Sequence, residues 1–230
     1  MTTEATGFLY PFIDADEGDA PRLVATMARS AAAKMVQSET LRHAVLEQHA
    51  ESVDRAGRGL AGRFARGGRL LAMGNGGSAT DAEGLVALFA DPPGGVPFPA
   101  LALTGEVAVV TALANDVGFD KVFSRQVIAL AGPDDCLVGF STSGDSSNLL
   151  RAFDEASARG LLTIGFSGLG GGAMAAFGSL DECLVVPSDS VHRIQEAQDA
   201  LAHGLWSAVQ RWWRTPPTSE ETGRGQGSAP

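Results

Sequence analysis

The stretch Leu70-Leu-Ala-Met-Gly-Asn-Gly-Gly-Ser78 joins a short apolar run to a turn of glycines and polar residues, and a helical pattern follows from about Asp81. The run is too short for a buried helix and predicts a buried strand. Small residues at the start of a helix leave backbone N–H groups open where the helix dipole is positive. The turn therefore predicts an anion site with Asn75 and Ser78 as further donors, although Ser78 or Thr80 also fits an ordinary helix cap.

The rest of the chain repeats this alternation of short apolar runs with helical stretches. The expected strands are Leu70–Met73, Ala100–Leu103, Cys136–Phe140, Leu161–Phe166 and Cys183–Val186. The expected helices between and after them are about Asp81–Phe89, Glu106–Ala114, Phe119–Leu130, Ser147–Arg159 and Val191–Trp213. Such alternation predicts an α/β fold: a doubly wound, five-stranded parallel sheet with helices on both faces, that is, a three-layer sandwich.

Two helices precede the first strand, at Pro21 to about Met35 and at Ser38 to about Phe64. No stretch in the middle of the chain resembles a long linker, and 230 residues suffice for one sizeable core. We therefore expect a single domain over residues 21–213, after an N-terminal segment at residues 1–20. Residues 214–230 hold no large apolar side chain and predict a disordered tail.

The composition disfavours several classes of protein. With 27 acidic and 17 basic residues the net charge is −10, which disfavours binding to nucleic acids or anionic membranes. Cys136 and Cys183 lie in apolar runs and suggest neither a disulfide framework nor a metal cluster. The N-terminus lacks the basic start of a secretory signal, and no apolar run approaches the ~18 residues of a membrane span. The expected location is the cytoplasm.

A second polar loop, Ser141-Thr-Ser-Gly-Asp-Ser-Ser147, follows the third expected strand and precedes a helix. Its five hydroxyl groups exceed what a cap and a turn require, and hydroxyls can surround a phosphate without adding charge. At the carboxyl ends of parallel strands, this loop and residues 74–78 would meet in the crevice where open α/β sheets bind ligands. The glycine spacing does not fit a dinucleotide-binding turn, and no lysine follows as in a nucleoside-triphosphate loop.

Over about residues 20–213 the chain resembles the phosphoheptose isomerases, a family of sugar isomerase (SIS) proteins. Four motifs appear in the family's order: Gly74-Asn-Gly-Gly-Ser78, Asn115-Asp-Val-Gly-Phe119, Ser141-Thr-Ser-Gly144 and Arg193-Ile-Gln-Glu196. The resemblance implies a SIS domain in a homotetramer that interconverts sedoheptulose 7-phosphate and a heptose 7-phosphate. The phosphate-region residues that it implies are Asn75, Gly76, Gly77, Ser78, Ser141, Thr142, Ser143 and Ser146. It further implies that Asn115 and Asp116 meet sugar hydroxyls and that Gln195 faces the reacting end.

An aldose–ketose isomerisation needs a base and an acid, and the resemblance implies His203 for one of these roles, on roughly the same side of the last helix as Gln195. The family's histidine and glutamate on the helix after the first loop are here Gly84 and Leu88. His192 replaces a family aspartate and is either a second proton-transferring group or a surface histidine at a helix start. Only Gln195 and His203 remain of the family's four zinc ligands, fewer than the three of a catalytic zinc site, so we predict no metal and no cofactor.

The sequence leaves two functions open. The retained pocket favours isomerisation of sedoheptulose 7-phosphate or a related sugar phosphate, with His203 and either His192 or Glu196 moving protons. The absent glutamate instead favours a non-catalytic sugar-phosphate sensor, or an oligomeric adaptor like the replication-initiator-associating relatives of the family. A residue from a neighbouring subunit would also complete the site. The expected partners are a small sugar phosphate and further copies of the chain, with no nucleic acid and no membrane.

Overall fold

The computed structural model describes residues 20–215. Residues 1–19 of the expected N-terminal segment and residues 216–230 of the expected tail lie outside this range. Contacts divide the chain into two units, Met1–Leu41 and Arg42–Pro230. The described part of the first unit is helical and belongs to α1 (Ala20–Gln48). The sheet and all the site residues lie in the second unit.

The sheet contains five parallel strands in the order β2-β1-β3-β4-β5. The strands are β1 (Leu70–Gly74), β2 (Ala100–Ala102), β3 (Cys136–Phe140), β4 (Leu162–Ser167) and β5 (Glu182–Val185). Every residue of β1 and β3 is buried, as expected for central strands covered on both faces. The prediction of a doubly wound, five-stranded parallel sheet is confirmed.

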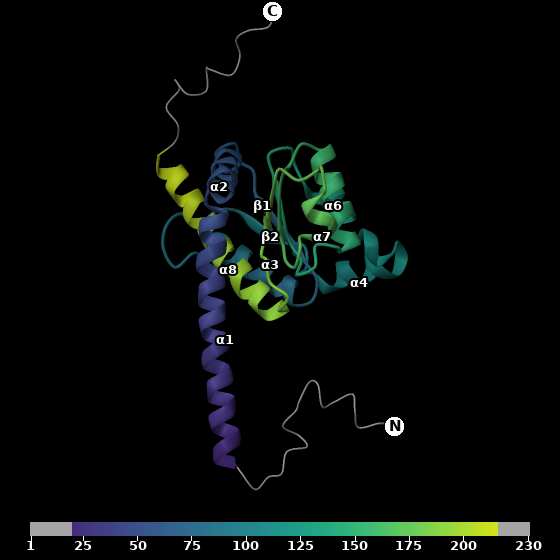
Figure 1. Cartoon of the computed structure of the whole chain (residues 1–230). Helices are drawn as coiled ribbons and strands as arrows, with labels where there is room; N and C mark the ends of the chain where they lie inside the picture. The colour runs from purple at the N-terminus through teal and green to yellow at the C-terminus, as the bar shows by residue number, and fades with distance from the viewer. Residues whose placement is uncertain (1–19, 216–230) are drawn as a thin grey trace, which may run out of the picture. The chain divides into compact units, whose positions relative to one another are not determined.

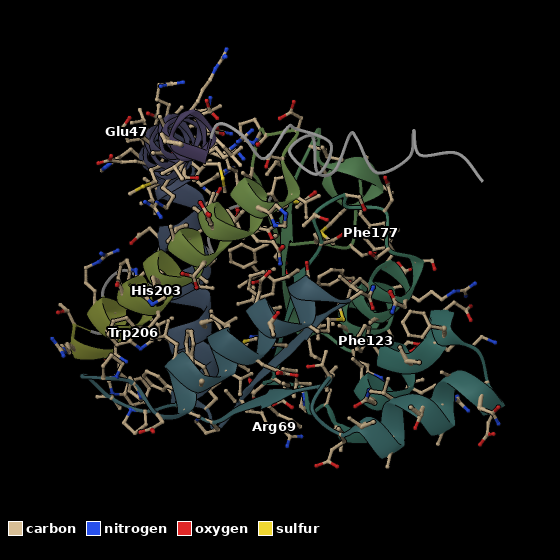
Figure 2. All side chains as sticks on the ribbon, turned by 90° about the horizontal axis from the view of Figure 1, so that it is seen from below. Glu47, Arg69, Phe123, Phe177, His203 and Trp206 are labelled. Carbon is tan, nitrogen blue, oxygen red and sulfur yellow. The ribbon has the colours of Figure 1, made fainter. Side chains whose placement is uncertain are left out.

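Helices cover both faces of the sheet (Figure 1). On one face α2 (Ala50–Ala65), α3 (Gly77–Ala90) and α8 (Val191–Arg214) pack together, and on the other α5 (Val122–Leu130) packs on α6 (Ser147–Ala158). α4 (Val107–Asp116) and a 3-10 turn (Phe119–Lys121) lead into α5. Phe123 and Phe177 lie across the sheet from His203 and Trp206 of α8 (Figure 2). Within residues 20–215, no helix is long and apolar enough to cross a membrane.

The N-terminal helices divide later than the sequence predicts. The prediction of a helix break between Met35 and Ser38 is wrong, because α1 runs to Gln48 and α2 begins at Ala50. Residues 22–56 contain no proline or glycine that would mark the break. It falls at His49, which leaves helical geometry with φ −103° and ψ 10°. The Nε2 atom of His49 lies 2.9 Å from the carbonyl oxygen of Val185 in β5, so a tertiary contact accompanies the break.

The loop after β4 also differs from expectation. It contains a short helix, α7 (Gly172–Ala175), that the glycine-rich sequence does not signal. The helix expected over Phe119–Leu130 begins instead with the 3-10 turn. Both departures occur where glycines at positive φ, Gly118 and Gly171, precede the turn.

Candidate active site

The sheet reverses its winding direction between β1 and β3, because β1 pairs with β2 on one side and with β3 on the other. From the end of β1 the chain enters α3, and from the end of β3 it enters α6, on opposite faces of the sheet (Figure 1). Such a divergence opens a crevice at the carboxyl ends of the strands, where doubly wound folds bind ligands. The loops at residues 74–78 and 141–147 follow these two strands and border the crevice.

A reciprocal pair of amides ties the two sides of the crevice together. The Nδ2 atom of Asn75 donates to Oδ1 of Asn148, and Nδ2 of Asn148 donates to Oδ1 of Asn75, each at 2.9 Å. Asn148 lies in the first turn of α6 and is buried. Asn75 therefore holds the first loop against the helix that follows the second loop, and it keeps one further N–H for a ligand.

The first loop presents backbone donors at the start of α3. Gly76, with φ 58°, precedes the helix, so neither Ser78 nor Thr80 is its cap. The N–H groups of Ser78 and Ala79 bond back to Asn75 and Gly76, whereas those of Gly76 and Gly77 have no acceptor among residues 20–215. Two open N–H groups at a helix N-terminus suit an anion. The side chain of Ser78 is buried at 5% exposure inside the first turn.

The second loop uses part of its hydroxyl groups to hold its own shape. Ser141 Oγ accepts the N–H of Gly144 at 3.0 Å and lies 3.3 Å from Oγ of Ser146. Ser143 Oγ accepts the N–H of Asp145 at 3.2 Å. Ser146 immediately precedes α6, and its side chain makes no capping bond to that helix. Beyond its contact with Ser141, the hydroxyl of Ser146 has further hydrogen-bonding capacity for a ligand at the positive end of α6.

Glycines let the backbone after β4 close over this second loop. A Cβ on Gly144, whose φ is 76°, would lie 2.0 Å from the carbonyl oxygen of Gly171. A Cβ on Gly172 would lie 2.3 Å from the carbonyl oxygen of Ser143. The carboxylate of Asp145 also accepts the N–H of Ala173 at 2.8 Å. The glycine-rich stretch is thus a packing surface for the hydroxyl loop.

Helix α8 supports the second loop from the core. Gln198 is completely buried, and its Nε2 donates to the carbonyl oxygen of Ser141 at 3.1 Å. Its Oε1 is buried and has no partner in the part of the chain that the structure describes. An unpaired buried acceptor costs free energy, so this side chain gains its stabilisation from one bond only.

Gln195 lines a hollow of about 400 Å³ between α3 and α8, which we call the Gln195 hollow. Its lining residues are Thr80, Asp81, Gly84, His192, Gln195, Glu196 and Asp199. Nε2 of Gln195 donates to Oδ2 of Asp81 at 3.1 Å, and a Cβ on Gly77 would lie 2.5 Å from the same nitrogen. The amide therefore contacts both the anion loop and a carboxylate.

The partial burial of Asp81 perturbs the acidity of its carboxyl group. Burial raises the pKa of its carboxyl above the ordinary value; the hydrogen bond from Gln195 opposes this shift, and the charge of Asp199 adds to it. A carboxylate with a raised pKa, placed in a hollow beside an anion site, is a candidate general base.

His203 lines a neighbouring hollow of about 360 Å³, the His203 hollow, which shares Gly84 and Asp199 with the first. Nδ1 of His203 lies 3.0 Å from the carbonyl oxygen of Asp199 and 3.6 Å from its Oδ1. Nδ1 is therefore the protonated nitrogen of the neutral ring, which leaves Nε2 as the acceptor. Leu88 lines this hollow too and offers no proton-transfer group.

The remaining predicted site residues, Asn115 and Asp116, lie elsewhere. Both are exposed at the end of α4, where Nδ2 of Asn115 donates to Oδ1 of Asp116 at 2.9 Å. Neither lines the Gln195 hollow or the His203 hollow. The structure of one chain thus links the two loops through Asn75 and Asn148 and places Gln195 and His192 in a hollow next to the first loop, but it does not bring Asn115 and Asp116 there.

The residues present do not fit the four-ligand zinc site of the resemblance. Gly84 and Leu88 carry no donor atom, and Gln195 and His203 line different hollows. Over residues 20–215, no group of three His, Cys, Asp or Glu side chains could hold a metal ion.

Sequence reasoning missed two residues of the site, Asp81 and Gln198. Asp81 comes three residues after Ser78 and three before Gly84, so helical spacing was a signal that it shares their side of α3. Gln198 follows Gln195 by three residues within the core stripe of α8, and a polar residue in an apolar stripe is the signal that could have identified it.

Comparison with known proteins agrees with this geometry. The family model described as the SIS domain matches residues 35–168. A phosphoheptose isomerase of Solidesulfovibrio magneticus is 43% identical over 200 residues, which cover 84% of this chain and 91% of that protein. The solved phosphoheptose isomerase of Neisseria gonorrhoeae aligns with a TM-score of 0.74 and 34% identity, covering 80% of this chain and 99% of that one. That of Francisella tularensis aligns with a TM-score of 0.75 and 31% identity over 80% and 98% of the respective chains.

Proposed function

Because this chain belongs to the phosphoheptose isomerase family of SIS-domain proteins, we propose that it binds a phosphorylated sugar and interconverts its aldose and ketose forms. Sedoheptulose 7-phosphate or a closely related sugar phosphate is the proposed substrate. The observation that carries the proposal is the meeting of two anion-suited loops with Gln195 and Asp81 at one crevice.

The proposed phosphate site combines the open N–H groups of Gly76 and Gly77 with hydroxyls from the second loop. Helix N-termini and uncharged donors bind a phosphate dianion without a lysine or arginine, which is consistent with the acidic character of the chain. Thr142 and Ser146 contribute the hydroxyls, while Ser141 and Ser143 hold the loop in shape.

The proposed chemistry needs a group that moves a proton between adjacent carbons and a group that moves one between their oxygens. Asp81 is the proposed carbon base, because its half-buried carboxylate lies beside the anion loop and its raised pKa favours proton uptake. Nε2 of His203, or the imidazole of His192 in the Gln195 hollow, is proposed for the oxygen-bound proton. Gln195 orients Asp81 through its amide. None of these steps requires a metal.

We further propose that the protein works in the cytoplasm as a homotetramer, as the family resemblance implies. In such an assembly a neighbouring chain is the proposed source of additional sugar contacts. This is also the proposed context for Asn115 and Asp116, which one chain alone leaves exposed away from the hollows.

The test is NMR of sedoheptulose 7-phosphate in deuterated water with the full chain. We expect deuterium to enter at the carbon next to the carbonyl, and Asp81→Asn and His203→Gln to slow its entry about 100-fold or more. His43→Gln is the matched control, because His43 is exposed and lies in neither hollow, and it should leave the rate unchanged.

The other outcomes are equally informative. Thermal stabilisation by the sugar phosphate without deuterium entry would replace the isomerase with a sugar-phosphate sensor or adaptor. If the sugar phosphate causes neither thermal stabilisation nor deuterium exchange, the proposed phosphate site itself is refuted.

A further inference from the structure

Helix α2 carries a stripe in which arginines alternate with glycines, far from the motifs of the candidate active site. The sequence Arg55-Ala-Gly-Arg-Gly-Leu-Ala-Gly-Arg-Phe-Ala-Arg66 repeats arginine at spacings that keep all four side chains on one face of a helix. Gly59 and Gly62 lie on the same face between them. The arginines therefore flank a strip of small residues, where the side chain of Leu162 lies 2.9 Å from the position that a Cβ on Gly59 would take.

This stripe forms one wall of a hollow of about 810 Å³, the arginine groove. The residues that define it are Arg55, Arg58, Arg63, Arg66, Trp212 and Trp213. The tryptophans come from the last turn of α8, which packs on α2 (Figure 1). Leu162, the first residue of β4, also lines the groove, so the groove reaches the amino end of the sheet, whereas the candidate active site lies at the carboxyl end.

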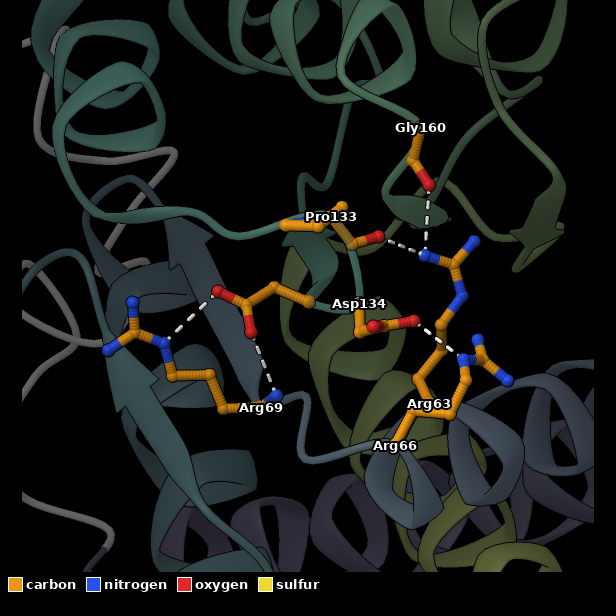
Figure 3. A network of polar contacts seen from close by, with 7 residues as sticks. Arg63, Arg66, Arg69, Pro133, Asp134 and Gly160 are labelled. Carbon is orange, nitrogen blue, oxygen red and sulfur yellow. Dashed lines mark hydrogen bonds and ion pairs between the residues drawn. The ribbon is translucent and has the colours of Figure 1, made fainter.

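Two of the four arginines are held by carboxylates. Arg55 pairs with Glu182 through two hydrogen bonds, at 2.7 and 3.1 Å, and Arg66 pairs with Asp134 at 2.6 Å (Figure 3 shows the second pair). These pairs fix the ends of the stripe and neutralise its outer charges.

Within residues 20–215, no carboxylate neutralises the charges of the two inner arginines. Nη1 of Arg63 donates to the carbonyl oxygens of Pro133 and Gly160, at 2.7 and 2.9 Å, so neutral groups orient it (Figure 3). Arg58 stands over the ring of Trp212, 5.3 Å from its centroid. Within residues 20–215, neither forms a salt bridge. Two guanidinium groups thus remain unneutralised in a chain of net charge −10.

The aromatic wall is held rigidly. Nε1 of Trp212 donates to Oδ1 of Asp54 at 3.1 Å, and Trp213 meets Phe98 edge-on with ring centroids 5.1 Å apart. Trp213 nevertheless remains 37% exposed. Indole rings at the wall of a hollow offer flat surfaces for another ring, and guanidinium groups match the geometry of phosphate oxygens.

We propose that the arginine groove binds an aromatic phosphate of the nucleotide class, with its ring against Trp212 and Trp213 and its phosphate on Arg58 and Arg63. Cations and indoles line the same hollow, so a single molecule that carries both a ring and a phosphate would contact both. The volume is within the range of pockets that enclose ligands of this size. This site is separate from the sugar-phosphate crevice, and its test does not depend on whether the protein is an isomerase.

The experiment is calorimetric titration of the full chain with AMP, adenosine and pyrophosphate. We expect AMP to bind, and adenosine and pyrophosphate to bind about tenfold or more weakly, because each lacks one of the two recognised groups. Arg58→Gln and Trp212→Leu should each weaken AMP about tenfold, since each removes one contact. Arg151→Gln, at an exposed arginine of α6 that pairs with Asp120, is the matched control and should bind AMP like the wild type.

Sedoheptulose 7-phosphate at saturating concentration, the proposed ligand of the crevice, separates the groove from the crevice. AMP binding that survives this competitor and is lost in Arg58→Gln supports the proposal. AMP binding that the sugar phosphate displaces, or that Arg58→Gln leaves intact, assigns the nucleotide to the crevice and overturns it. No AMP binding to the full chain overturns it as well.

Discussion

Replacing Gln198 by leucine separates the stabilising and destabilising parts of one buried side chain. The substitution removes an Oε1 that has no partner among residues 20–215, and it breaks the bond from Nε2 to the carbonyl oxygen of Ser141. Removing the unpaired acceptor should restore about 1–3 kcal/mol, and leaving the Ser141 carbonyl bare should cost about the same. We therefore expect the free energy of unfolding to stay within about 1 kcal/mol of the wild type.

Gln210 provides a matched control on the same helix. It is also buried, but both ends of its amide are used: Oε1 accepts the N–H of Val96 at 2.9 Å, and Nε2 donates to the Val96 carbonyl at 2.7 Å. Gln210→Leu should lower the free energy of unfolding by about 2 kcal/mol or more, because two backbone groups lose their partner and no unpaired group is relieved.

The assays are urea unfolding and sugar-phosphate titration of both variants. Gln198→Leu should bind sugar phosphate about tenfold more weakly, since Gln198 holds the Ser141 carbonyl of the second loop, whereas Gln210→Leu should bind like the wild type. If Gln198→Leu loses as much stability as Gln210→Leu, then Oε1 has a partner in solution and the reasoning from an unpaired acceptor is wrong.

Three further predictions concern single positions. Burial raises the pKa of Asp81, so the contribution of this carboxyl to stability is complete below its pKa in the unfolded chain and is lost as the pH rises through its pKa in the folded protein. The melting temperature of Asp81→Asn, relative to that of the wild type, should therefore be higher at pH 7 than at pH 3. An equal difference in melting temperature at both pH values would contradict the raised pKa. Gly144→Ala should lower the free energy of unfolding by about 2 kcal/mol or more, because φ is 76° and the new Cβ would lie 2.0 Å from the carbonyl oxygen of Gly171. Gly178→Ala is the control, because a Cβ there has nothing within 4 Å. Equal urea midpoints for the two variants would refute the predicted clash. Burial raises the pKa of the Cys136 thiol to about 12, so iodoacetamide should leave it unmodified at pH 8 in the native protein and alkylate it in urea, as mass spectrometry can show.

The fold could be predicted from local sequence patterns, because each helix or strand depends mainly on its own residues. The run Cys136–Phe140 is a strand with the predicted bounds, since an apolar run of this length between turn residues has few alternatives. The helix break at His49 could not be predicted from the sequence, because the contact of His49 with Val185 joins residues far apart in the chain. The same holds for α7, whose backbone packs on the hydroxyl loop.

The site divides in the same way. By itself the sequence determined the parallel sheet and predicted the two anion-suited loops, because residue type and spacing suffice for these. The resemblance to the phosphoheptose isomerases identified Gly84 and Leu88 as positions without the family's donor groups. Only the tertiary structure decided that Asn75 pairs with Asn148 and that Asp81 meets Gln195. The physical reason is that hydrogen-bond partners and burial depend on which helices pack across the sheet, and a partly buried carboxylate such as Asp81 looks the same in the sequence as an exposed one.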